Sequence, residues 1–286
     1  MPRKTLSWPL AIVLVIAVVI TLFPVFWIVM TALKPPTDWN AVPAIWMPSH
    51  PTIVNFRTLF DPDALREYGV GGVSQAATAA VRGSLLASIV ATALSILIGL
   101  LAAIGLARYG NGGRSTALVI LSGRMFPPAA IAVPFVIIYS SVGLIDTYAG
   151  LIAIYVAATL PFSTWMLKSF VDDLPREIEE AAMVDGRSRL AAHLMVTIPL
   201  IRGGLFATAM FIFILNWSEF MFALVLSYTS VITIPVQLAK YVTATAGTLY
   251  GVQAALAVLA MVPLVIAGFL IQSHLARGMT FGAVKR

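Results

Sequence analysis

The sequence predicts an all-α membrane protein with six transmembrane helices and one long charged loop between the fourth and fifth. Of its 286 residues, 60% are hydrophobic and only 10% are charged, whereas about 25% of the residues of an average soluble domain are charged. Six apolar runs are each long enough to cross ~30 Å of hydrocarbon as a helix, which takes about 20 residues. The chain has no cysteine, which excludes disulfides, thiolate metal sites and cysteine nucleophiles.

Charged or turn-forming residues bound each predicted span. The first span follows Arg3 and Lys4 but is longer than the ~7–15 apolar residues of a cleavable signal peptide, so we expect it to be retained. A tight polar turn at residues 108–114 ends the second span. The six spans cover residues 9–33, 83–107, 116–139, 144–167, 203–226 and 251–275.

The distribution of basic residues predicts the orientation of the chain. Most of its 18 Lys and Arg residues lie in the termini and in the loops on the same side as the N-terminus. Because positive charge is enriched on the cytoplasmic side, we expect both termini to be cytoplasmic. Topology thus accounts for the net charge of +6 without a nucleic-acid partner. Residues 34–82 then form an outer loop, in which we expect irregular structure and a short helix on the membrane face.

The inner loop, residues 169–202, has the densest charge in the sequence. Pro175 suits the first position of a helix, and the acidic residues after it lie near the positive end of the helix dipole. Gly186 is placed as a left-handed cap, and a second helix is expected from Ser188 until Pro199. A short helix, a bend and a second short helix form a shape suited to docking in a partner's groove.

The same loop resembles the EAA signature of binding-protein-dependent ABC import permeases, E-A-A-x3-G-x9-I-x-L-P. The matching residues are Glu180, Ala181, Ala182, Gly186 and Pro199, with Val196 in place of Ile and Ile198 in place of Leu. Two further stretches, residues 216–220 and the tail 278–285, are similar to the sugar branch of this family, in particular the smaller permease of maltose-type importers.

The resemblance implies a type I ABC importer permease in the bacterial inner membrane, for a sugar, oligosaccharide or related polyol. It implies a heterodimer with a second permease, a cytoplasmic ATPase dimer and an extracytoplasmic solute-binding protein. The loop residues expected to couple to the ATPase are Glu180, Ala181, Ala182, Asp185, Gly186 and Pro199. The tail would contact it through Gly278, Thr280, Gly282 and Lys285. Contact with the binding protein is assigned to Thr243, Thr245 and Gly247.

Charged residues and prolines within the predicted spans are candidates for the translocation path. Arg124 and Glu219 differ by about 12 Å in predicted depth, so a direct ion pair between them is not expected. Two interpretations stay open: they line the path, or Arg124 extends to the inner surface and Glu219 bonds to a neighbouring helix. Prolines free carbonyls that must face protein or water. The candidate path residues are Arg124, Pro127, Pro128, Asn216, Trp217 and Glu219.

Catalytic chemistry is not predicted for this chain. It has no Gly-x4-Gly-Lys-Ser/Thr motif, so ATP and Mg²⁺ are expected on the partner ATPase. The three histidines, His50, His193 and His274, are expected to be isolated, and no metal site is predicted. Two alternatives remain: an ion-driven secondary transporter or channel that uses Arg124 and Glu219 as a relay, and an ABC permease for a non-sugar solute.

Overall fold

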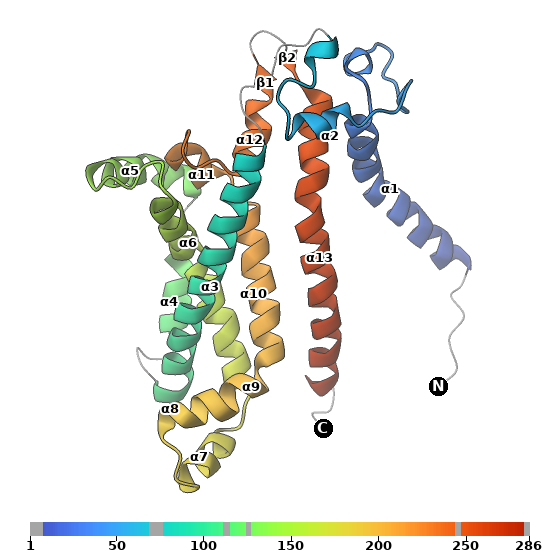
Figure 1. Cartoon of the computed structure of the whole chain (residues 1–286). Coiled ribbons are helices and arrows are strands. Elements are labelled where there is room, and N and C mark those ends of the chain that lie inside the picture. The colour runs from blue at the N-terminus through green and yellow to red at the C-terminus, as the bar shows by residue number, and fades with distance from the viewer. Residues whose placement is uncertain (1–7, 69–76, 111–114, 124–126, 244–246, 283–286) are drawn as a thin grey trace. The chain divides into compact units, whose positions relative to one another are not determined.

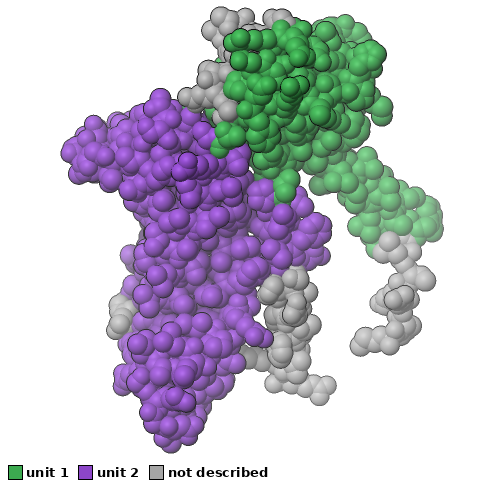
Figure 2. All heavy atoms as spheres, in the orientation of Figure 1, with its two compact units in different colours: residues 1–78, 237–262 green, residues 79–236, 263–286 purple. Residues whose placement is uncertain are grey.

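The structure of the chain is a computed structural model and describes residues 8–68, 77–110, 115–123, 127–243 and 247–282. These residues are mainly helical (Figure 1). They divide into two compact units (Figure 2). The first comprises residues 1–78 and 237–262, and the second comprises residues 79–236 and 263–286.

The first unit contains one long helix and a compact loop. Helix α1 (Trp8–Ala32) has no charged residue, and most of its large side chains are exposed. Short elements follow: η1 (Pro36–Asp38), α2 (Val54–Thr58) and η2 (Arg66–Tyr68). The unit also holds the end of α12 (Ile234–Lys240), the antiparallel pair β1 (Val242–Thr243) and β2 (Gly247–Thr248), and the start of α13 (Tyr250–Gly282).

Buried polar side chains organise the loop after α1. The Asn55 amide donates hydrogen bonds to the carbonyls of Ala32 (2.8 Å) and Lys34 (2.7 Å), which caps the end of α1. A Cβ at Gly251 would overlap Trp39 and Asn55, so α13 approaches this loop closely. The short helix expected in the loop is α2, and the described residues around it are mostly turns and irregular backbone, as predicted. Its position on the membrane face stays a prediction.

In the second unit, α3 (Thr78–Tyr109) lies beside α6 (Tyr148–Asp172) (Figure 1). Small and hydroxyl side chains join the two helices. Ser95 Oγ lies 2.8 Å from Thr159 Oγ1, and Ser163 Oγ donates to the Ser95 carbonyl at 2.8 Å. A Cβ at Gly99 would overlap Ser163 Oγ. Small residues allow membrane helices to approach closely, and hydroxyls join them.

Helix α10 (Arg202–Trp217) also packs against α6, and the remaining helices are shorter. They are α4 (Thr116–Ser122), α5 (Pro128–Ser141), α7 (Arg176–Val184), α8 (Arg189–Ala192), the π-helical turn η4 (His193–Thr197), α9 (Ile198–Leu200) and α11 (Met221–Leu226). One hydrophobic cluster joins α3, α5, α6 and α11 around Tyr155, and another joins the ends of α3 and α6 to Ile201.

Among the described residues, four helical segments are long and apolar enough to cross a membrane: α1, α3, α6 and residues 250–272 of α13. A fifth is added if the bent pair of residues 189–200 and 202–217 counts as one span. The predicted third span is divided between α4 and α5, with residues 124–126 outside the described part of the chain. The predicted fifth span is interrupted between α10 and α11. A six-span topology therefore stays a prediction.

Candidate functional site

The candidate site is the loop from α7 to α9, between the two long helices α6 and α10. Pro175 stands in an extended conformation before α7, and acidic residues occupy the first turn, as predicted. Gly186 has φ = +85°, and a Cβ built on it meets no atom within 4 Å. Its backbone N–H donates to the Met183 carbonyl at 3.1 Å, so the predicted left-handed glycine cap is confirmed.

The second helix of the loop starts at the predicted residue but is not regular. Ser188 Oγ accepts a hydrogen bond from the Ala191 N–H at 3.2 Å, the N-cap geometry expected from the sequence. After α8 the chain widens into the π-helical turn η4, followed by α9 with Pro199. A bend of 74° separates residues 189–200 from α10. Such π-helical turns occur often at functional sites.

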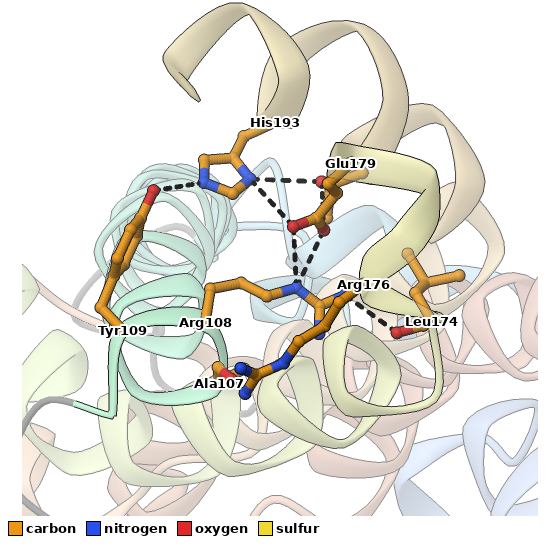
Figure 3. A network of polar contacts seen from close by, with 8 residues as sticks. Ala107, Arg108, Tyr109, Leu174, Arg176, Glu179 and His193 are labelled. Atoms are coloured by element: carbon orange, nitrogen blue, oxygen red, sulfur yellow. Dashed lines mark hydrogen bonds and ion pairs between the residues drawn. The ribbon is translucent and has the colours of Figure 1, made fainter. Parts of the chain in front are cut away.

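A buried ion pair fixes α7 against the end of α3 (Figure 3). Arg108 Nε donates to both carboxylate oxygens of Glu179 at 2.9 Å, and Arg108 Nη2 donates to the Leu174 carbonyl at 3.1 Å. In return, Arg176 Nη2 donates to the Ala107 carbonyl at 3.0 Å. The side chains of Arg108 and Glu179 are only 6% and 7% exposed. The first turn of α7 is therefore tied to α3 by charge-assisted hydrogen bonds.

The ion pair continues into η4 through a chain of hydrogen bonds (Figure 3). The Thr197 hydroxyl donates to Glu179 Oε1 at 2.8 Å, so it can accept at the same time from His193 Nδ1, 3.3 Å away. The Tyr109 hydroxyl lies 2.8 Å from His193 Nε2 and donates to it in this arrangement. A neutral imidazole with its proton on Nδ1 satisfies every one of these bonds.

The expectation that His193 is isolated is wrong. Its ring packs edge-on against Tyr109, with the ring centroids 5.9 Å apart, and its Nδ1 lies 3.9 Å from Glu179 Oε2. Sequence reasoning missed the contact with Tyr109 because the two residues are 84 positions apart in the chain. In the part of the chain that the structure describes, no group of three His, Asp or Glu side chains is arranged to hold a metal ion.

A pocket of about 190 Å³ opens between α3, α7, α8 and η4. It is lined by Arg108, Tyr109, Arg176, Glu179, Glu180, Met183, Arg189, Ala192 and His193. Large apolar side chains on the same loop are exposed: Ile178, Met183, Val184, Leu190, Leu194 and Met195. We call these six residues the apolar strip. An exposed apolar surface of this kind marks a site of protein or membrane contact.

Most of the predicted coupling residues lie on the open side of this loop. Glu180, Ala181, Asp185, Gly186 and Pro199 are exposed, and Ala182 is half-buried. Sequence reasoning did not identify the residues that anchor the loop from behind, namely Arg108, Tyr109, Glu179, His193 and Thr197. The one available signal in the sequence was helix geometry. Glu179 and Glu180 are consecutive residues, so on a helix their side chains point about 100° apart and cannot both face the same partner.

Several candidate path residues have structural partners. Asn216 is buried and donates to Thr92 Oγ1 at 3.1 Å. The Glu219 carboxylate accepts the backbone N–H groups of Phe222 (3.0 Å) and Ala223 (3.1 Å), so it starts α11 and interrupts the predicted fifth span. These donors lie in the next turn of the chain and not on a neighbouring helix, so both interpretations of Glu219 stay predictions. Trp217 is buried, Pro127 and Pro128 begin α5, and Arg124 lies outside the described residues.

The two other predicted contact regions are described in part. In the segment before α13, Thr243 pairs with Gly247 between β1 and β2, and Thr245 lies outside the described residues. In the tail, Gly278, Thr280 and Gly282 belong to α13, so the helix continues beyond the predicted end of the sixth span. Lys285 lies outside the described residues.

Long apolar helices and an anchored helix–bend–helix loop with exposed apolar side chains are features of a membrane protein with a surface suited to contact with another protein. Residues 95–281 match the family model for the inner membrane component of binding-protein-dependent transport systems. The chain belongs to this family, which supplies the permease subunits of ABC importers.

Named relatives agree with this membership, and a solved structure has the same fold. The chain is 32% identical to the sulfoquinovosyl glycerol transport system permease protein SmoH of Agrobacterium fabrum, over 92% of this chain and 89% of the relative. It is 30% identical to the trehalose/maltose transport system permease protein MalG of Thermococcus litoralis, over 95% and 94%. Its fold matches a chain of a bacterial ABC transporter involved in the import of alginate, with a TM-score of 0.72, 18% identity and coverage of 96% and 99%.

Proposed function

We propose that this permease carries a sugar or oligosaccharide into the cytoplasm, as one half of a translocation path completed by a second permease. The support comes from relatives whose names specify saccharide-type solutes, SmoH and MalG. It also comes from the stretch 216–220 and the tail 278–285, which resemble the sugar branch. A solute-binding protein delivers the solute from outside, and both termini lie in the cytoplasm.

The observation that carries the mechanism is the two-sided construction of the loop. Behind it, the buried pair of Arg108 and Glu179 holds α7 on α3. In front, the apolar strip and the exposed Glu180 are free to meet another protein. A cytoplasmic ATPase pair, which binds the ATP and Mg²⁺, docks on this front face.

The hydrogen-bond chain gives such docking a mechanical consequence. Movement of α7 acts on α3 through Arg108 and on η4 through Thr197, and η4 leads directly into α10. Closure of the ATPase pair thereby reorients two long helices at once and alternates access to the path. The Gly186 bend lets α7 and α8 present one continuous docking face.

The alternative of an ion-driven transporter requires a relay through Arg124 and Glu219. Both carboxylate oxygens of Glu219 already accept backbone N–H groups of α11, which disfavours a role in which the carboxylate exchanges ions or protons. A permease for a non-sugar solute has the same loop, so solute transport assays must distinguish it from a saccharide permease.

A substitution at Gly186 with a matched control tests the coupling role. We expect Gly186→Asp to reach the membrane but to abolish substrate-stimulated ATP hydrolysis in vesicles that hold the complete importer. The control is Gly143→Asp, in the link between α5 and α6, because Gly143 also has positive φ (+69°) and no atom within 4 Å of an added Cβ. Normal stimulated hydrolysis in Gly186→Asp, or equal loss in both variants, would contradict the proposal.

Co-purification from native membranes tests the assembly, and uptake of labelled saccharides by the reconstituted complex tests the solute. A second permease, an ATPase and stimulation by a saccharide are the expected results. Ion-driven uptake by this chain alone would refute the ABC mechanism, and stimulation only by an amino acid or peptide would refute the sugar assignment.

A further inference from the structure

An unusually apolar segment lies in the loop after α1. Residues 41–48 read Ala-Val-Pro-Ala-Ile-Trp-Met-Pro, without one polar side chain. We call residues 41–48 the apolar tip. Val42, Trp46 and Met47 are 96%, 60% and 67% exposed, respectively. Loops that face water rarely expose a continuous run of large apolar side chains, so we infer that another protein or lipid covers this segment.

The apolar tip is held in place at its base. The buried Asp38 carboxylate accepts hydrogen bonds from the backbone N–H of Ser49 (2.8 Å) and from its hydroxyl (3.0 Å). The Thr52 N–H donates to the Leu33 carbonyl at 2.9 Å. These bonds close the loop on both sides of the apolar tip, so its exposed side chains are presented by an ordered base.

The apolar tip folds back along α1. The Trp46 ring lies 5.8 Å from the Phe23 ring and 5.9 Å from the Trp27 ring, measured between centroids. At a rise of about 1.5 Å per residue, Phe23 and Trp27 lie about 14 and 8 Å before the end of α1. Trp46 is therefore level with the outer part of a helix that is long and apolar enough to cross the membrane.

From this geometry we propose that the apolar tip is a membrane anchor that inserts into the lipid leaflet beside α1, with Trp46 in the outer part of the acyl chains. Helix α1 has 25 residues, about 37 Å, which exceeds the ~30 Å hydrocarbon core by a few ångströms at each end. A position about 8–14 Å below its end therefore lies about 4–10 Å inside the edge of the hydrocarbon, in its outer part.

Two features favour lipid over a protein partner. No Asp, Glu, Lys or Arg occurs between Asp38 and Arg57, whereas a protein-docking surface has a polar rim. Pro43 and Pro48 have no backbone N–H, which reduces the number of donors that must find a partner at the edge of the hydrocarbon. The exposed apolar surface of the tip is also continuous with that of α1, which Trp46 contacts.

The natural sequence makes the test direct, because it has no cysteine that would compete for a label. Nitroxide labels are placed on Val42→Cys and Trp46→Cys in the full-length chain, purified with its accompanying subunits and reconstituted in phosphatidylglycerol–phosphatidylcholine vesicles. Collisions with lipid-soluble oxygen and with a water-soluble nickel chelate are measured. Val19→Cys on α1 is the reference for lipid, and His50→Cys, exposed just beyond the base, is the reference for water.

We expect the labels at positions 42 and 46 to lose nickel collisions to the level of position 19 and to retain oxygen collisions, while position 50 stays accessible to nickel. Free access of nickel to both tip labels would overturn the proposal. Protection from both reagents would also overturn it, because that result means that a protein covers the tip.

Substitution of Asp38 tests whether its hydrogen bonds to Ser49 hold the apolar tip in the membrane. In Asp38→Asn, which leaves the apolar residues intact, we expect the label at position 46 to gain nickel collisions. Asp63→Asn, in the same loop at an exposed carboxylate, should leave that label unchanged. If Asp38→Asn does not fold, Ser49→Ala removes one of the same hydrogen bonds, and an unchanged depth in the folded variant would overturn the role of the base.

Discussion

Replacement of Glu179 by alanine is the sharpest test of how the loop is anchored. The change removes a carboxylate that accepts two contacts from Arg108 Nε and one from the Thr197 hydroxyl. It leaves the Arg108 guanidinium buried with the Leu174 carbonyl as its remaining acceptor among the described residues. Loss of one partner of a buried pair costs about 3–5 kcal/mol, mainly because the other charge stays buried without compensation.

The neighbouring Glu180 is the matched control. It has the same side chain on the same helix but is exposed, and surface substitutions usually change stability by less than about 0.5 kcal/mol. We therefore expect Glu179→Ala to lower the free energy of unfolding by about 3–5 kcal/mol and Glu180→Ala to leave it almost unchanged. Denaturant unfolding in mild detergent, followed by tryptophan fluorescence, measures both.

A double-mutant cycle separates the ion pair from other effects of the substitutions. Because Arg108→Ala and Glu179→Ala remove the same contact, the double variant should lose less stability than the sum of the two, by about 1–3 kcal/mol. Additivity within about 0.5 kcal/mol would show that the two side chains do not stabilise each other, and the anchoring argument would fail.

Three further predictions concern the packing and the links of the second unit. Gly99→Ala should cost about 1–3 kcal/mol of unfolding free energy because its Cβ overlaps Ser163 Oγ, whereas Gly203→Ala, with no atom within 4 Å, should gain up to about 1 kcal/mol from helix propensity. Asp146→Asn should lower stability by about 1 kcal/mol at pH 7, because the amide cannot replace the charged acceptor of the N–H groups of residues 228–231. Burial raises the pKa of the Asp146 carboxyl, but these hydrogen bonds outweigh it and hold that pKa below its usual value. Because the pKa of Asp146 is lower in the folded protein than in the unfolded chain, its contribution to stability is present above the unfolded pKa of about 3.9 and is lost as the pH falls further. The difference in unfolding free energy between wild type and Asp146→Asn should therefore shrink below about pH 4. A difference that grows at low pH would contradict this pKa argument. Gly186→Ala should cost about 1–2 kcal/mol through its positive φ, and Gly186→Asn less, because asparagine tolerates that conformation; equal losses in unfolding measurements would exclude this cause.

The sequence predicts those parts of the fold that depend on local chemistry. Apolar length predicts the helices α1, α3 and α6, and a glycine after an amphipathic segment predicts the left-handed cap at Gly186. Ser188 is likewise recognisable as an N-cap. Each of these needs only residues within a few positions of one another.

Interruptions of the apolar runs are harder to predict. Residues 203–226 read as one continuous span, yet Glu219 starts a new helix by accepting two N–H groups of α11. A carboxylate in an apolar run has several ways to find donors: a basic side chain, a neighbouring helix or, as here, the free N–H groups of the next turn. The sequence does not rank these possibilities, because all of them satisfy the charge.

The anchor of the loop was missed for a different reason: each of its residues already has a sufficient local explanation. Arg108 reads as one of the positive charges that flank a span on the cytoplasmic side, and Glu179 reads as an acidic residue in the first turn of a helix. Nothing in either pattern asks for a partner, and the two residues are 71 positions apart. Their pairing depends on the approach of α7 to the end of α3, which the small side chains on α3 and α6 establish well away from the loop. Glu180 can be recognised from the sequence because it belongs to a signature of nearby residues, whereas Glu179 becomes interpretable only once helix packing has fixed what lies behind it.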